Sequence, residues 1–150
     1  MRIRMDTTYA KDFDLWLRQT VRLLRERRWQ EIDLEPLIEE IESLGKSERR
    51  AIAGQLTRLL LHLLKWQYQP QRRSDSRLDS ISDARTQIEL VTQDSPSLRD
   101  YPAEQLEQSY GRARQKAATQ TKLPLSTFPE QCPYALPLVL DDSWLPEERA

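Results

Sequence analysis

Residues 48–68, ERRAIAGQLTRLLLHLLKWQY, decide the fold class of this chain. Their apolar residues recur at spacings of three and four, which is typical of one face of an α-helix. This face consists of Ile52, Leu56, Leu59, Leu60 and Leu63, and Leu61 and Leu64 widen it to nearly half of the circumference. We therefore expect a central helix that packs on more than one side and ends before Pro70.

The composition of the whole chain points the same way. Only three glycines occur in 150 residues, whereas an all-β protein needs glycine at many tight turns. A chain of this length is an ordinary single domain, residues 1–150, that can bury a core without metals or disulfides. We expect an all-α fold, a helical bundle of about five helices. These helices are expected at about residues 8–28, 34–45, 48–68, 76–93 and 102–121.

The region before the central helix leaves one alternative open. Asp33 is a good N-cap, and Pro36 suits a first helical turn. Gly45 could end or bend this helix, and Ser47 could cap the next one. The pattern therefore allows residues 34–68 to form either two helices or one kinked helix.

Two further apolar stripes precede the central helix. The first consists of Phe13, Trp16, Leu17, Thr20, Val21 and Leu24. The second consists of Leu34, Leu37, Ile38, Ile41 and Leu44, and Glu39, Glu40 and Glu42 cover the rest of that helix. Because an amphipathic helix normally buries its apolar face, we expect both stripes to join the central helix in one shared interior.

The composition of the sequence changes after Leu123. Five of the nine prolines lie between residues 124 and 146, which excludes long helices there. Apolar residues such as Phe128, Tyr134 and Trp144 are interleaved with them and are too numerous for a free linker. We expect residues 123–150 to form one or two short helical turns packed over the bundle as a lid. Whether this lid covers a pocket is left open.

Cysteine usage and hydropathy bear on the compartment. The single cysteine, Cys132, excludes an intramolecular disulfide and favours a reducing compartment. The N-terminus lacks the apolar run of a secretory signal. The most apolar stretch, residues 59–64, is far shorter than the ~20 residues of a membrane span. We expect a cytoplasmic protein without a membrane partner.

Several of the sequence's longer motifs resemble the family catalogued as domain of unknown function 29, small proteins common in cyanobacteria. The resemblance covers about residues 9–145 and implies an all-α fold. It implies no activity, cofactor or active-site residue. The motifs that carry it are Asp12-Phe13 with Trp16-Leu17, residues 33–50 (DLEPLIEEIESLGKSERR), residues 63–70 (LLKWQYQP), residues 94–99 (DSPSLR), and Phe128-Pro129-Glu130 with Cys132-Pro133-Tyr134.

Carboxylates and the single histidine are the candidates for a metal site. Glu39 and Glu42 share a helix face at i, i+3, and His62 could join them across a helix interface. Helical di-metal sites, however, use a Glu-x-x-His pair, and position 59 is Leu. We expect no cofactor, and interpret the glutamates as a solvated face and His62 as a packing residue. A carboxylate metal-dependent hydrolase is the weakest functional alternative.

Basic and aromatic residues alternate after the central helix, in residues 65–74, KWQYQPQRRS. Arginine can fork onto phosphates and aromatic rings can stack on unpaired bases, so this segment suggests nucleic-acid binding. A pI near 5.9 and the expected placing of cations at a helix C-terminus speak against it. The candidate contact residues are Arg49, Arg50, Arg58, Lys65, Arg72, Arg73 and Arg77.

The sign of the net charge alternates between successive blocks of the sequence. Residues 1–30 carry eight basic and four acidic side chains, and residues 31–48 carry one and seven. Such blocks suit the pairing of acidic and basic helix faces. No Gly-rich phosphate loop, nucleophile elbow or zinc-protease motif occurs in the sequence. The primary interpretation is a non-catalytic helical binding or adaptor protein that contacts another protein or a second copy of itself, and nucleic-acid binding is the alternative.

Overall fold

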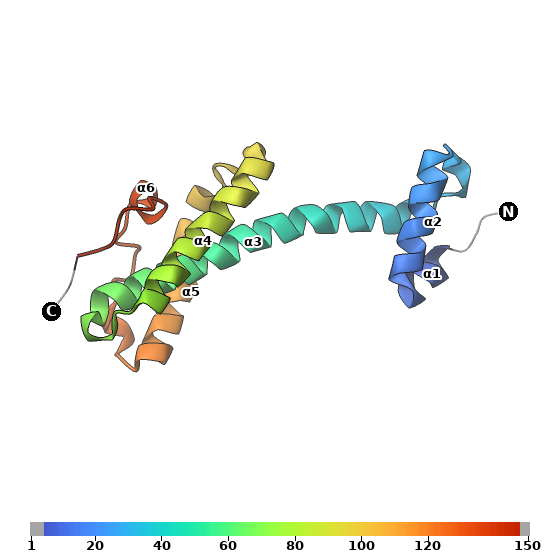
Figure 1. Ribbon diagram of the computed structural model, residues 1–150. Coiled ribbons are helices and arrows are strands. Elements are labelled where there is room, and N and C mark those ends of the chain that lie inside the picture. The colour runs from blue at the N-terminus through green and yellow to red at the C-terminus, as the bar shows by residue number, and fades with distance from the viewer. Residues whose placement is uncertain (1–4, 148–150) are drawn as a thin grey trace. The chain divides into compact units, whose positions relative to one another are not determined.

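The computed structural model describes residues 5–147, and every regular element in that range is helical (Figure 1). The predicted all-α fold is therefore confirmed. The α-helices are α1 (Met5–Lys11), α2 (Phe13–Arg25), α3 (Leu34–Tyr68), α4 (Asp75–Asp94), α5 (Tyr101–Thr121) and α6 (Leu136–Val139). Short 3₁₀ turns connect them: η1 (Trp29–Glu31), η2 (Pro70–Arg72), η3 (Pro96–Leu98) and η4 (Leu125–Thr127).

Residues 34–68 form one continuous helix, α3, rather than two. Gly45 lies inside it without ending it. A glycine in a helix interior costs only about 1 kcal/mol relative to alanine, and the leucines and glutamates around it favour helix. The helix ends at Tyr68, and Pro70 begins the following 3₁₀ turn.

The contacts of the chain divide it into two compact units, Met1–Lys46 and Ser47–Ala150. We call them the N-terminal unit and the C-terminal unit. The division falls within α3, so that residues 34–46 of this helix belong to the first unit and residues 47–68 to the second.

The N-terminal unit contains α1, α2, η1 and the beginning of α3. The expected single helix over residues 8–28 is wrong in its bounds, because the chain breaks at Asp12 and α2 ends at Arg25. Asp12 caps α2 by accepting a hydrogen bond of 3.0 Å from the backbone N–H of Leu15. At the other end Arg27 has a φ of 58°, a left-handed conformation that stops the helix.

The core of the C-terminal unit forms around the second half of α3. Leu56, Leu59, Leu60, Leu63 and Leu64 are all fully buried, as predicted. α4 and α5 supply the other side of this core through Ile81, Ala84, Ile88, Tyr110, Ala113 and Ala117. The small Ala113 and Ala117 of α5 are fully buried in this core.

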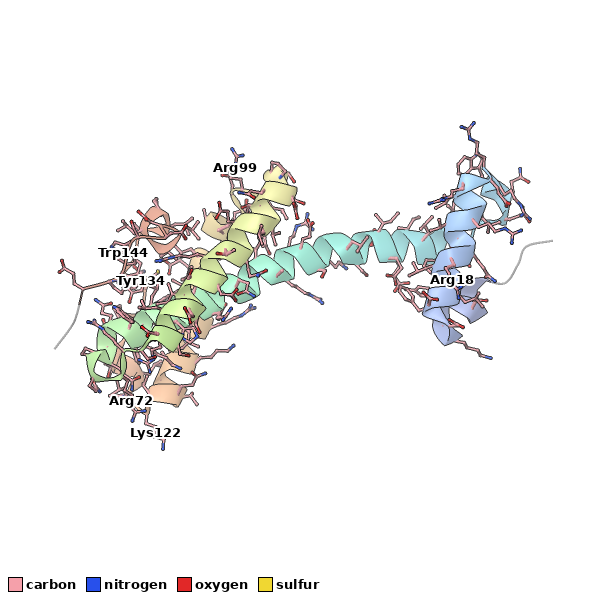
Figure 2. The ribbon with its side chains drawn as sticks, in the orientation of Figure 1. Arg18, Arg72, Arg99, Lys122, Tyr134 and Trp144 are labelled. Carbon is pink, nitrogen blue, oxygen red and sulfur yellow. The ribbon has the colours of Figure 1, made fainter. Side chains whose placement is uncertain are left out.

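The segment after α5 contacts all three long helices of its unit. Phe128, Tyr134 and Val139 are buried in the same core. The Tyr134 hydroxyl donates a hydrogen bond of 2.6 Å to Oε1 of Gln67 in α3, and the Tyr134 ring meets the edge of Trp144 (Figure 2). Residues 122–147 contain two short helical pieces, η4 and α6.

Candidate functional site

Exposed apolar side chains concentrate in the N-terminal unit. Of the large apolar side chains that are exposed in the described part of the chain, ten lie in this unit and three in the larger C-terminal unit. Single exposed apolar residues are ordinary, whereas a contiguous set marks an interaction surface. The N-terminal unit therefore carries the candidate interaction surface.

Helix α2 exposes most of its apolar stripe. Trp16 and Thr20 of the predicted stripe are buried, and Leu23 joins them. Each residue advances about 100° around a helix. The buried side of α2 is therefore centred on Trp16, Thr20 and Leu23, and the remaining apolar residues of the stripe lie on the adjacent side. The expectation that the whole stripe enters a shared interior is wrong, since four of its members are exposed: Phe13, Leu17, Val21 and Leu24.

The beginning of α3 shows the same arrangement. Leu37 packs partly against the small core of Trp16, Leu23 and Ile32. The rest of the predicted stripe is exposed by 44–69 %, which corrects the expectation for this helix as well. Its exposed members are Leu34, Ile38, Ile41 and Leu44.

A side of α3 other than its exposed apolar stripe makes the contacts with the rest of the N-terminal unit. The Tyr9 hydroxyl donates a hydrogen bond to Oε1 of Glu40. This hydrogen bond, with a further contribution from the charge of Glu39, raises the pKa of Tyr9 to about 12. Pro36 is buried, and Glu40 is half-buried. The side of α3 that carries Pro36 and Glu40 is thus used inside the unit, and the stripe beside it is left exposed.

Each exposed stripe is bordered by charge of one predominant sign. Arg18 and Arg25 follow the α2 stripe, and Glu35 and Glu42 follow the α3 stripe, at positions given by about 100° per residue. Arg18 pairs with Asp14 of the same helix at 3.1 Å and projects into solvent (Figure 2). Among the described residues, Arg25, Glu35 and Glu42 form no ion pair or side-chain hydrogen bond.

Arg58 and Lys65 of the predicted nucleic-acid set make contacts within the C-terminal unit. Arg58 pairs with Asp83 of α4 at 2.6 Å. The ammonium of Lys65 donates to Oε1 of Gln120 in α5, and burial lowers the pKa of Lys65. Both side chains therefore tie α3 to neighbouring helices.

Arg73 and Arg77 are engaged at the end of α3. The Arg73 guanidinium lies 4.8 Å from the ring centroid of Trp66 and donates from Nε to the Trp66 carbonyl at 3.0 Å. Arg77 donates to the Lys65 carbonyl at 3.3 Å and to Oε1 of Gln69 at 3.0 Å. These carbonyls belong to the last turn of a helix, where cations are stabilising. Both arginines cap the C-terminal end of α3 by donating hydrogen bonds to its backbone carbonyls.

The remaining members, Arg49, Arg50 and Arg72, are exposed. Arg50 precedes Lys65 by fifteen residues on one helix, a separation of roughly 23 Å along the axis at 1.5 Å per residue. The set thus divides into a pair near the start of its unit, Arg58 in the middle of α3, and a group of four around the α3–α4 connection. The structure does not bring all seven residues onto one patch.

The three candidate metal ligands lie in different units. Glu39 and Glu42 are exposed on the N-terminal unit, and His62 is half-buried in the C-terminal unit. No group of three or more His, Cys, Asp or Glu residues in the described part of the chain is placed to hold a metal ion. Burial and the nearby charges of Lys65, Arg58 and Arg77 lower the pKa of His62 to about 4.

Cys132 lies half-buried against the core of the C-terminal unit. Its thiol faces the Tyr134 carbonyl at 3.5 Å. Burial is the main reason why the pKa of Cys132 is raised, and a raised pKa disfavours the nucleophilic thiolate. This geometry suits a packing role for Cys132.

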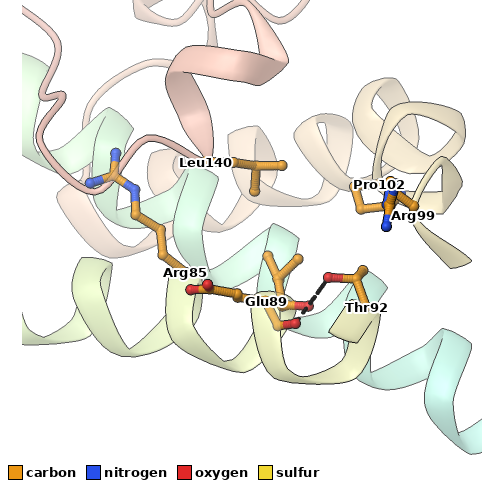
Figure 3. A pocket seen from close by; sticks show the side chains of 7 residues that line it. Arg85, Glu89, Thr92, Arg99, Pro102 and Leu140 are labelled. Atoms are coloured by element: carbon orange, nitrogen blue, oxygen red, sulfur yellow. Dashed lines mark hydrogen bonds between the residues drawn. The ribbon is translucent and has the colours of Figure 1, made fainter. Parts of the chain in front are cut away.

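A small pocket of about 200 Å³ lies between α4, α5 and the C-terminal segment (Figure 3). Arg85 lines one end but directs its guanidinium to backbone carbonyls, and the Thr92 hydroxyl bonds to the carbonyls of Ile88 and Glu89. Pockets for small molecules usually measure about 300–1,000 Å³. This pocket is smaller, and its polar lining is largely occupied. Sequence reasoning did not single out these residues.

None of the helices in the described range has both the length and the apolar character that a bilayer span requires. The chain belongs to the family described as Domain of unknown function DUF29, whose model matches residues 8–145. The resemblance seen in the sequence is thereby confirmed over nearly its full range. No curated protein and no solved structure matches the chain.

Proposed function

We propose that this chain is a non-catalytic protein-binding protein whose N-terminal unit carries the contact surface. One observation supports this most directly: the apolar stripes of α2 and α3 are exposed, although both follow the helical periodicity of a buried face. Protein interfaces combine an apolar centre with a charged rim, and both stripes have such a rim. We call the eight exposed side chains of the two stripes the apolar surface: Phe13, Leu17, Val21, Leu24, Leu34, Ile38, Ile41 and Leu44.

Site-specific photo-crosslinking in native cells tests this proposal. A photo-reactive phenylalanine replaces Ile41 in one variant, and Leu90 in the matched control. Both positions are exposed, by 59 % and 49 %, but Leu90 lies on α4 outside the apolar surface. Discrete protein adducts are expected from position 41 and not from position 90. Equal adduct patterns, or none from position 41, would overturn the proposal.

A second candidate, nucleic-acid binding, has one observation in its favour. Arg72 is exposed at the α3–α4 connection beside Arg77, whose nearest hydrogen-bond partners are neutral oxygens rather than carboxylates. Burial lowers the pKa of Arg77, and the positive charge of the neighbouring Arg72 lowers it further. Such charge attracts phosphates.

Gel shifts with single-stranded and duplex oligonucleotides at two salt concentrations test this second candidate. Phosphate contact must weaken steeply as salt rises. The variant Arg72→Glu should then bind less than Arg99→Glu, an exposed arginine elsewhere in the same unit. Absence of a shift by the wild-type chain at low salt would eliminate this candidate.

A further inference from the structure

The N-terminal unit has a small core of its own. Its buried apolar residues are Trp16, Leu23 and Ile32, and Tyr9 and Leu37 pack partly against them. Trp16 Nε1, Gln19 Oε1 and Thr20 Oγ1 are buried without a hydrogen-bond partner among the described residues. Below about 40 residues a chain usually needs oligomerisation, metals or disulfides for stability, and this unit of 46 residues lies close to that size. Further apolar burial would stabilise it.

We infer that the apolar surface is covered by the apolar surface of a second copy of this chain, in a twofold symmetric dimer. This inference rests on the proposed function and names its partner. A twofold interface requires a surface that is complementary to itself. The N-terminal unit meets this requirement because one of its stripes has a basic rim and the other an acidic rim.

The arrangement of charge determines how the two copies meet. The basic rim, Arg18 and Arg25 on α2, lies against the acidic rim, Glu35 and Glu42 on α3, of the second copy, and the same contact recurs across the symmetry axis. An acidic or basic partner protein would match only one of these rims. The acidic rim has no ion-pair partner among the described residues of its own chain, and opposite charges across an interface select the partner and its orientation.

The number of exposed apolar side chains in the N-terminal unit also favours a covered interface. The largest apolar patch of a typical monomer is about 300–600 Å², and a standard interface buries about 800 Å² per partner. Each of the eight side chains of the apolar surface is at least 37 % exposed. A second copy would cover these eight side chains together with their charged rims.

Sedimentation equilibrium of the full chain over a concentration series tests the inference. The wild-type chain is expected to have twice its chain mass of 17.8 kDa at high concentration. The variant Ile41→Asp places a charge in the apolar surface and should shift the mass to that of one chain. Leu90→Asp on α4, an equally drastic change outside the surface, should leave the dimer intact.

Charge reversal provides a test that removes no apolar contact. One variant carries Arg18→Glu and Arg25→Glu, and another carries Glu35→Lys and Glu42→Lys. All four side chains are exposed, so the fold should persist, which circular dichroism checks. Each variant alone is expected to dimerise at least about tenfold more weakly, a cost of about 1.4 kcal/mol. The control Arg112→Glu with Lys116→Glu, both exposed on α5, should dimerise like the wild type.

Mixing the two charge-reversed variants is the decisive step. In a twofold contact between α2 and α3, the mixed pair restores opposite charges at both sites, so a heterodimer of wild-type affinity should form. A wild-type chain that stays at one chain mass at every concentration overturns the inference, and so does a mixture that stays as weak as its components. If position 41 then still crosslinks to a different protein, the proposed function stands and only the self-association fails.

Discussion

The Nε of Arg85 in α4 donates a hydrogen bond of 2.8 Å to the backbone carbonyl of Val139 in α6, fifty-four residues later. The same guanidinium reaches the Trp144 carbonyl from Nη2, also at 2.8 Å. Arg85 is only 4 % exposed. One buried cation therefore satisfies carbonyls of a segment that has little secondary structure of its own.

We predict that Arg85→Met destabilises the C-terminal unit by about 2–4 kcal/mol. Methionine retains much of the apolar stem, but the carbonyls of Val139, Asp142 and Trp144 lose their donor. The buried Val139 carbonyl then pays the largest desolvation penalty. Urea denaturation measures the loss. Arg99→Met is the control, because Arg99 is exposed and its side chain has no hydrogen bond in the described part of the chain. Equal stability of the two variants would contradict the role assigned to Arg85.

Tyr110→Phe should cost about 1 kcal/mol, the usual contribution of one hydrogen bond. The Tyr110 hydroxyl donates to the Pro129 carbonyl at 2.6 Å, and burial raises the pKa of Tyr110. Tyr101→Phe is matched to it, since the half-buried Tyr101 hydroxyl makes no hydrogen bond within the described residues. The difference between the two variants in urea denaturation gives the contribution of the bond. A difference near zero would mean that this bond does not hold the segment.

His62 is the only histidine, so its NMR titration is unambiguous. A midpoint near pH 4 is expected instead of the ordinary 6.5, because burial and the charges of Lys65, Arg58 and Arg77 disfavour the imidazolium. The unfolded chain then binds one more proton than the folded chain between these values. Stability should therefore fall as the pH drops from about 6.5 towards 4.

The variant His62→Gln should remove this part of the acid destabilisation and leave the part due to carboxylates. The urea midpoints of the wild type and the variant, compared at pH 7 and at pH 5, give the contribution of His62 to the loss of stability on acidification. Parallel losses in both proteins, or an NMR midpoint near 6.5, would show that His62 is as well hydrated as in a peptide.

Gly54→Ala and Gly111→Ala should each stabilise the protein by about 0.5–1 kcal/mol. Both glycines lie inside helices, and a Cβ at either position meets no atom within 4 Å. Alanine lowers the entropy of the unfolded chain without a steric cost. Thermal unfolding should show the gain, and Ala51→Gly, at an exposed position of α3, should show a loss of similar size. Destabilisation by either alanine would indicate a neighbour that the fold described above lacks.

The single thiol, Cys132, should react slowly with a disulfide reagent in the folded protein. Its raised pKa lowers the thiolate fraction at pH 8, and its half-buried position limits access. We expect the reaction rate of the thiol in buffer to be well below its rate in urea, where the chain is unfolded and the thiol is accessible to the reagent. Equal rates would exclude the packing role for Cys132.

Much of the C-terminal unit could be predicted from the sequence because its periodic apolar faces are also its buried faces. Leu56, Leu60 and Leu63 of α3 are the clearest cases. The same reasoning misplaced the stripes of α2 and of the beginning of α3. Periodicity shows that a helix face is apolar, but it does not show whether another part of the same chain covers that face.

The structural roles of Arg85 and Asp12 were not predicted from the sequence. Arg85 lies between Ile81 and Ile88 in the sequence, and a cation at this position can donate to carbonyls of a segment rich in proline. Asp12 lies inside the single helix expected over residues 8–28, whereas it is the cap at which α1 and α2 are separated. In both cases the deciding partner is a backbone group, which residue patterns do not display.

The continuity of α3 through Gly45 means that no linker separates the two units. A protease or a truncation at residues 46–47 would cut hydrogen-bonded helical backbone and leave the new helix start with four N–H groups that lack acceptors. Fragments designed at this boundary should therefore fray from the cut end, and each half needs an engineered cap to be studied separately.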